Sequence, residues 1–134
     1  MQHPVHCADR NGDGGGNGRL VFFPGRKKAV SLHTVWDTLI LQRSKGKQSV
    51  AEYGDALNEK ITEKQAKAWA TGTPQAWAAG SWEVARDVVY RDVPAAGNPP
   101  VISEEYIARA QPIVDEQIQK AGVRLAAALN LAFR

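Results

Sequence analysis

A change of pattern near residue 30 limits what this chain can fold into more than any other feature of its sequence. From Val30 onward, apolar residues recur three and four positions apart, the spacing that places them on one face of an α-helix. Before that position the chain carries most of its Gly, Asp and Asn residues and has little helical periodicity. The sequence therefore predicts an all-α fold over residues 29–134, preceded by a loop region over residues 1–28.

Helix-start signals divide the periodic region into separate segments. In each signal a Ser or Thr can cap the first turn, or a Pro occupies it: Ser31, Thr62, Pro74 and Ser103. We expect the first helix to run to about Ser44, before the polar break SKGKQS, and the helix that starts at Pro74 to end near Arg91. Another helical segment lies between them, over 50–61. Pro112 should bend or divide the last helix because its ring removes a backbone donor.

Two further expectations concern the hairpin and the core. The run GRLVFFPGR is rich in β-forming residues and is bounded by turn residues, which predicts a small β-hairpin within residues 1–28. Trp36 is expected to be buried against the helices. Trp69, Trp77 and Trp82 stand at helical spacing with other apolar residues, so we also expect them in the core.

Positive charge is concentrated near the N-terminus. The 17 Lys and Arg residues exceed the 14 Asp and Glu residues by three, and this small excess alone is weak evidence for a nucleic-acid partner. Basic residues are densest around LVFFPG, at Arg19, Arg26, Lys27 and Lys28. An anion would be steered toward this part of the surface.

Several features argue against other classes of protein. Cys7 is the only cysteine, so it cannot form an internal disulfide, and we interpret it as a packed thiol. No apolar run approaches the roughly 18 to 20 residues of a membrane span, so no membrane partner is expected. The first residues lack the basic start and apolar stretch of a signal peptide. No glycine-rich nucleotide-binding motif stands in a convincing setting, so no nucleotide cofactor is indicated.

The segment LHTVWD carries the most informative pair of side chains. His33 and Asp37 are four residues apart in a segment predicted to be helical, which puts them on one face, roughly 6 Å apart. An imidazole nitrogen and a carboxylate oxygen both bind zinc, and a third protein ligand would leave a position for water. His6 is the natural third ligand, since the predicted hairpin allows the chain to fold back. On spacing alone, a surface His/Asp pair without a metal remains the alternative.

The remaining polar residues near the N-terminus are assigned weaker roles. His3 is separated from His6 by Pro4, a spacing that we expect to prevent both rings from facing one ion, so His3 is predicted to support the site or lie on the surface. Gly16 and Asn17 end the stretch DGGGN, where glycines let the backbone approach a bound group and the amide both donates and accepts hydrogen bonds. They are candidates for contacting a base or a phosphate. A flexible turn before the strand is the alternative.

The order of these motifs resembles a known family. HPVHCADRNGDGGGN, followed after a short β-prone run by SLHTVWD, is similar to the type I, or S-one/P-one, zinc-dependent nucleases of fungi, plants and bacteria. The segments WAAGSWEVARDVVY and ISEEYIARAQPIVDEQIQKAGVRLAAALN resemble the last helices of that family. The resemblance covers essentially the whole chain.

This resemblance implies a fold, a reaction and a set of ligands. The fold would be the mostly helical bundle shared by phospholipase C and these nucleases, and the enzyme would hydrolyse single-stranded DNA or RNA to 5′-nucleotides. The family holds up to three zinc ions; His6, His33 and Asp37 correspond to the protein ligands of one, and Asn17 corresponds to a residue near the substrate, in the loop that also holds Gly16. A secreted or periplasmic location is also implied.

The sequence departs from the family in length. Members are considerably longer and carry further zinc ligands that this sequence lacks. We therefore expect residues 1–134 to be the C-terminal part of a single zinc nuclease domain, with a metal and substrate loop and hairpin over 1–28, helices over 29–134, a missing N-terminal half and low intrinsic activity. The alternatives are a phospholipase C-like phosphodiesterase, which GGN beside HxxxWD argues against, and a non-catalytic helical zinc-binding module.

Overall fold

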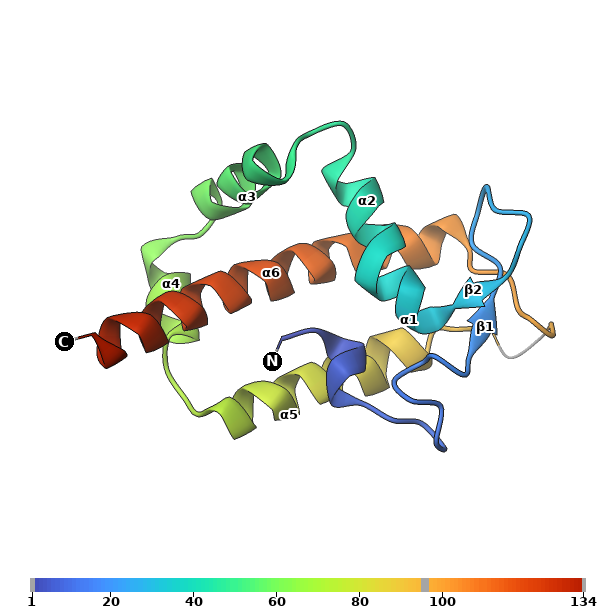
Figure 1. The fold of residues 1–134 in the computed structure, drawn as a ribbon, viewed down its shortest axis with the longest axis horizontal. Coiled ribbons are helices and arrows are strands. Elements are labelled where there is room, and N and C mark those ends of the chain that lie inside the picture. Colours follow the sequence, from blue (N-terminus) through green and yellow to red (C-terminus); the bar gives the residue numbers. More distant parts are fainter. Residues whose placement is uncertain (1, 95–96, 134) are drawn as a thin grey trace.

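The computed structural model describes residues 2–94 and 97–133, and Figure 1 shows its mainly helical architecture. Within these residues the one sheet has two short antiparallel strands, β1 (Leu20–Val21) and β2 (Val30–Ser31). The other elements are α-helices or short 3₁₀ and π turns: η1 (Pro4–Cys7), α1 (Leu32–Thr34), η2 (Val35–Leu39), α2 (Ile40–Lys45), α3 (Val50–Glu59), α4 (Glu63–Trp69), α5 (Pro74–Val84), η3 (Ala85–Tyr90) and α6 (Glu104–Ala132). The prediction of an all-α fold with one small hairpin is confirmed.

The predicted helix starts form as side-chain caps. The Ser31 hydroxyl accepts a hydrogen bond from the Thr34 N–H at 3.0 Å, and Ser103 and Thr62 make the same kind of cap at α6 and α4. Each cap satisfies a backbone donor that has no partner inside the helix. The helices begin directly after these residues because each cap joins a side chain to a backbone N–H only three residues later.

The last helix is a single element, Glu104–Ala132. Pro112 lies inside α6, which continues on both sides of it, so of the two expected alternatives, a bend or a division of the helix, division does not occur. Ala110 and Val114 flank the proline and are buried, and this packing holds the helix together where one backbone hydrogen bond is lost. Among the described residues, no helix is long and apolar enough to cross a membrane.

The β-hairpin extends beyond residues 1–28, the region in which the sequence predicts it. Val21 lies opposite Val30, so the second strand falls just after residue 28 and not within the loop region. The strand segment is also tied to the chain before α6, because the Phe22 N–H donates to the Pro100 carbonyl and the Ile102 N–H donates to the Phe22 carbonyl. Sequence pattern did not reveal this second pairing, since the two partners are far apart in the chain.

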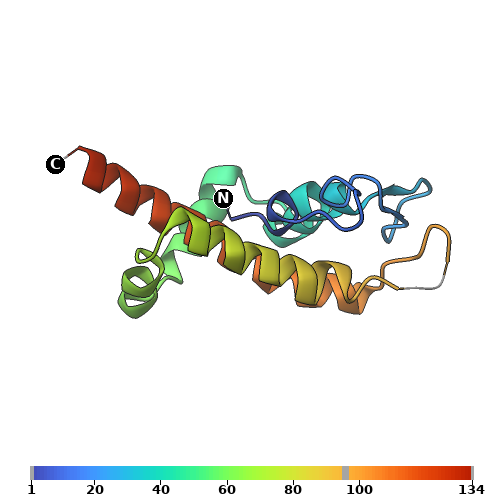
Figure 2. The same cartoon turned by 90° about the horizontal axis from the view of Figure 1, so that it is seen from below.

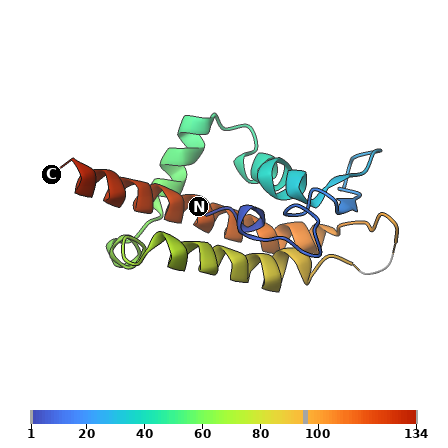
Figure 3. The ribbon, with the colours of Figure 1, turned by 60° about the horizontal axis from the view of Figure 1, so that its bottom comes forward.

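The elements form two layers that meet at the core. Figure 2 shows the N-terminal segment, the hairpin and the helix from α1 to α2 on one side of α5 and α6, and Figure 3 shows the same arrangement turned by 60° about the horizontal axis from Figure 1. The α2 segment contacts α6, and η1 contacts α5. This arrangement brings the first residues of the chain against the helix that begins after Ser31.

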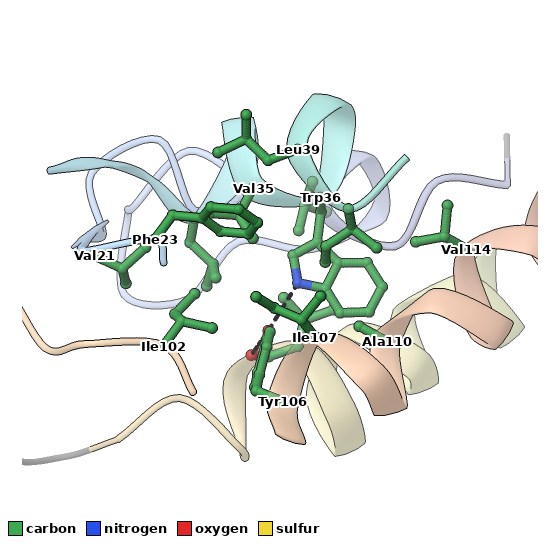
Figure 4. Packing of buried hydrophobic residues seen from close by; sticks show 14 of the residues in the cluster. Val21, Phe23, Val35, Trp36, Leu39, Ile102, Tyr106, Ile107, Ala110 and Val114 are labelled. Carbon is green, nitrogen blue, oxygen red and sulfur yellow. Dashed lines mark hydrogen bonds between the residues drawn. The ribbon is translucent and has the colours of Figure 1, made fainter. Parts of the chain in front are cut away.

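Trp36 occupies the centre of this core, as predicted. Its ring is 1% exposed and meets the ring of Tyr106 edge-on, with the centroids 6.4 Å apart (Figure 4). The indole N–H donates to the Tyr106 hydroxyl at 2.8 Å, and that hydroxyl donates to the Val89 carbonyl at 3.0 Å. The chain of hydrogen bonds therefore connects η2, α6 and η3 through groups that water cannot reach.

The other three tryptophans are not core residues, so that expectation is wrong. Trp69 and Trp77 are half-buried, and Trp82 is 44% exposed. They lie on α4 and α5 at the edge of the bundle, where cationic side chains stand over their rings: Lys120 over Trp69, Arg124 over Trp77 and Arg86 over Trp82. Helical spacing alone does not distinguish such a ring from one packed in the interior.

We predict that Tyr106→Phe destabilises the fold by about 1–3 kcal/mol, because the Trp36 N–H and the Val89 carbonyl both lose a buried partner. Urea denaturation followed by tryptophan fluorescence measures this change. Tyr53→Phe is the matched control, since the Tyr53 hydroxyl donates to Asp115 at a site that solvent partly reaches. A smaller loss for Tyr106→Phe than for Tyr53→Phe would contradict the assigned role of the buried hydrogen bonds.

Candidate metal centre

Three histidines converge on the carboxylate of Asp37. The Nε2 atoms of His3 and His6 each lie 3.3 Å from Asp37 Oδ1, and the Nε2 atom of His33 lies 3.4 Å from Oδ2. We call these four residues the His–Asp cluster. The ligand atoms of His3, His6 and Asp37 lie within 4.8 Å of one another, a spacing compatible with one metal ion. Two segments of the chain build the cluster, η1 and the helical region from α1 to η2.

The predicted one-turn relationship between His33 and Asp37 exists in the structure. Both lie on the helix that Ser31 caps, and a π turn at Val35–Leu39 interrupts its regular geometry. Such turns are rare and often occur at functional sites. Trp36, in the same turn, is buried in the core and anchors the turn, whereas the side chains of His33 and Asp37 remain partly exposed.

The orientation of His33 is set by the glycine-rich loop. Its Nδ1 lies 3.0 Å from the Gly15 carbonyl oxygen, an acceptor, so Nδ1 carries the proton and donates. In the neutral ring the lone pair is then on Nε2, the atom that faces Asp37. This is the arrangement found in metal-binding histidines, where a partner of one ring nitrogen fixes the other as a ligand.

The structure corrects the expectation for His3. Pro4 begins a 3₁₀ turn, in which side chains three residues apart lie above one another, so His3 and His6 face the same carboxylate oxygen. Both ring nitrogens of His3 are buried and make no hydrogen bond of good geometry with the described residues. Burial lowers the pKa of His3 below its ordinary value, which favours the neutral imidazole.

Backbone conformations available to glycine bring the loop close to the cluster. Gly15 and Gly16 have φ of +68° and +84°, in the left-handed region, and both are buried. A Cβ at Gly15 would lie 2.3 Å from the Val5 carbonyl oxygen, so the loop and η1 touch through their backbones. The Gly16 carbonyl accepts from the His33 N–H at 3.3 Å.

Asn17 is exposed beside this loop. Its side-chain N–H donates to the Gly14 carbonyl at 2.8 Å, which holds the amide in place at the surface. Cys7 is half-buried next to His6, in agreement with its interpretation as a packed thiol. A cavity of about 250 Å³ borders His3, His6 and Asp37, and its walls include the apolar residues Trp36, Leu41, Val114 and Ile118.

The chemistry of the cluster fits a metal cation. When the imidazoles are neutral, the Nε2 lone pair of His33 and an anionic oxygen of Asp37 are two acceptors facing each other at 3.4 Å. A proton or a cation between them relieves this repulsion. Neutral imidazole and carboxylate are ordinary zinc ligands, and His3 offers one further ring nitrogen beside Asp37.

The S1/P1 nuclease family model matches residues 1–134 of this sequence. The chain belongs to the S1/P1 nuclease family. Among curated proteins, Nuclease S1 of Aspergillus oryzae is 33% identical over an alignment that covers 98% of this chain and 50% of that protein. Endonuclease 2 of Arabidopsis thaliana is 31% identical, over 99% of this chain and 48% of that protein. The chain thus spans about half the length of the S1/P1 relatives that it matches.

His3 is the residue of this S1/P1 chain that sequence reasoning underestimated. A signal was present: the pair H-P-x-H places two histidines three apart, with Pro in the first turn of what becomes a 3₁₀ helix. In a longer helix, a spacing of three residues would likewise place both histidines on one face of the helix. The structure places His6 and His33 each against Asp37, with His3 as a further neighbour, and it places Gly16 against the backbone of His33. That His6, His33 and Asp37 bind one zinc stays a prediction.

Proposed function

We propose that this chain contributes the His–Asp side of the active site of a zinc-dependent endonuclease that hydrolyses single-stranded DNA or RNA to 5′-nucleotides. The convergence of His3, His6, His33 and Asp37 beside the glycine-rich loop carries the proposal, in a chain matched along its whole length by a nuclease family model. The names of the relatives, Nuclease S1 and Endonuclease 2, support the same reaction class.

Within this proposal the side chains have separate roles. His6, His33 and Asp37 would hold the zinc, and His3, whose Nε2 lies as close to Asp37 Oδ1 as that of His6, would keep the carboxylate in place. When bound, zinc would supply Lewis-acid polarisation of the phosphodiester and a nucleophilic water at neutral pH. The Gly15 carbonyl fixes the His33 ring, and the backbone at Gly16 lets a substrate approach closely. The Asn17 amide, held by Gly14, is placed to donate a hydrogen bond to a base or phosphate.

The rest of the site would come from another part of the same domain. The chain spans about half of its relatives, and we propose that residues 1–134 form the C-terminal part of a single nuclease domain whose other half supplies further metal ligands. A secreted or periplasmic location accompanies this proposal. The partners would be single-stranded nucleic acid and the N-terminal half of the domain, with no membrane involved.

The test is zinc-dependent cleavage by a longer polypeptide, in which the part of Nuclease S1 that this chain does not match precedes residue 1. We expect it to cleave a single-stranded oligonucleotide faster than a duplex, because splayed bases can enter a pocket that a stacked duplex cannot. Residues 1–134 alone should cleave very slowly. Asn17→Ala should lower kcat/KM by about tenfold, the effect of one hydrogen bond to a charged group, and leave zinc content unchanged.

Four results would contradict this proposal. Equal cleavage of duplex and single strand would remove the argument for splayed bases, and loss of zinc in Asn17→Ala would make that residue part of the metal site. Faster hydrolysis of a phosphatidylcholine substrate than of nucleic acid would instead favour a phospholipase C-like enzyme. Zinc binding by the longer polypeptide without any turnover would favour a non-catalytic module.

A further inference from the structure

A second cavity lies between the glycine-rich loop and the end of η3. Its volume is about 630 Å³, and three guanidinium groups line it, from Arg10, Arg19 and Arg91. Asp13 and Tyr90 form part of the same wall. None of the residues of the His–Asp cluster lines this cavity, although the same loop borders both. We call it the arginine groove.

Two of these arginines have no carboxylate partner. Within the described part of the chain, neither the Arg10 nor the Arg19 guanidinium forms an ion pair with a carboxylate, and each donates to a backbone carbonyl: Arg10 to that of Tyr90 at 3.2 Å, Arg19 to that of Pro94 at 3.4 Å. A guanidinium carries five N–H donors, so most of them remain free to bind an anion. Arg91, by contrast, donates to Asp92 at 3.2 Å.

The one carboxylate in the groove is already engaged. Asp13 accepts from the Arg10 backbone N–H and from the Tyr90 hydroxyl, both at 3.0 Å. Both bonds are made to Oδ1, and they hold the loop against η3. With Arg91 paired to Asp92, the wall carries the two positive charges of Arg10 and Arg19 against the one negative charge of Asp13, and this excess attracts phosphate.

The groove continues into a neighbouring cavity of about 440 Å³. The two share Arg10, Tyr90 and Arg91, and the second one extends to Trp82, whose ring is 44% exposed. The second cavity adds Asp9 and the ion pair between Arg86 and Asp87, which contributes no net charge. A surface of this length, basic at one end with an exposed indole at the other, fits several nucleotides better than an isolated phosphate ion.

We propose that the arginine groove binds the sugar–phosphate backbone of a single-stranded nucleic-acid segment outside the His–Asp cluster. The assignment rests on the proposed nuclease function, since it adds a strand-binding site to that enzyme. Phosphate oxygens are bound by Arg10 and Arg19, and a base lies against Trp82. Because one loop borders both sites, a strand held here is positioned relative to the cluster.

The experiment measures the binding of a fluorescein-labelled oligothymidylate to residues 1–134 by anisotropy, in chelator, at several salt concentrations. We expect Arg10→Gln and Arg19→Gln each to weaken binding about fivefold and to reduce the salt slope by about 0.7 for each phosphate that is no longer neutralised. Arg26→Gln is the matched control, because it removes the same charge from the same region outside the groove. Circular dichroism verifies that each variant remains folded.

The alternatives give different results. Equal weakening by Arg26→Gln and Arg19→Gln, or no weakening by either groove variant, would overturn the proposal. A second arm uses inorganic phosphate as a competitor: full displacement of the oligonucleotide at low millimolar phosphate would assign the groove to a free anion. Because chelator removes zinc from the anisotropy measurement, failure of the zinc site and failure of the arginine groove are measured separately.

Discussion

Asp37→Ala is expected to remove zinc binding from this chain. Both carboxylate oxygens face imidazole nitrogens, Oδ1 toward His3 and His6 and Oδ2 toward His33, so the substitution removes the group on which the ligands converge. The unsubstituted chain should retain about one zinc ion after dialysis, because His6, His33 and Asp37 would supply three ligands and water the fourth. Elemental analysis should find almost none in Asp37→Ala, His33→Ala or His6→Ala.

His3→Ala distinguishes a supporting residue from a ligand. If His3 only keeps the other side chains in place, its loss should weaken zinc binding by about 10- to 100-fold and leave the stoichiometry unchanged at high zinc. Asn17→Ala, in the adjacent loop, is the control and should bind zinc normally. Zinc lost in His3→Ala and retained in His33→Ala would instead assign the ion to His3, His6 and Asp37, the group whose ligand atoms lie closest together.

Gly15→Ala is expected to have the largest effect on stability. The added Cβ would lie 2.3 Å from the Val5 carbonyl oxygen and 3.2 Å from that of Ala8, so the loop and η1 must separate. Left-handed backbone costs about 1–2 kcal/mol for a residue with a Cβ, and overpacking adds about 1–3 kcal/mol. Separation of η1 also moves His6 and frees His33 from its carbonyl partner, so zinc binding should fall with stability.

Gly12→Ala provides a control for backbone strain. Gly12 has φ of +77°, close to the value at Gly15, but nothing lies within 4 Å of its added Cβ. Its cost should therefore be the strain alone, about 1–2 kcal/mol, with zinc binding retained. Urea denaturation gives both free energies of unfolding, and their difference measures how tightly the loop packs against η1. Equal costs for the two variants would show that this packing contributes nothing.

Local patterns were sufficient to predict most of the helices. Ser31, Thr62 and Ser103 cap helices because their hydroxyls satisfy backbone donors within three residues, an interaction that depends on the neighbouring sequence alone. The proximity of His33 to Asp37 follows from the same local geometry, since one helical turn joins them. The burial of Trp36 also follows from a local pattern, because Trp36 lies on the apolar face of this helix.

Contacts between distant segments were decided only by the tertiary structure. His3 reaches Asp37 because the tertiary fold brings the residues around η1 to the helix that carries Asp37. Trp69 and Trp77 are only half-buried because charged side chains of α6, and not apolar ones, stand over their rings, and Trp82 remains exposed. The arginine groove depends on Tyr90, whose hydroxyl donates to Asp13 77 residues away in the chain. The spacing of residues in a sequence indicates which side chains share one face of a helix or strand. It does not indicate which faces of different elements pack together, because that depends on how all the apolar surfaces of the chain are buried at once.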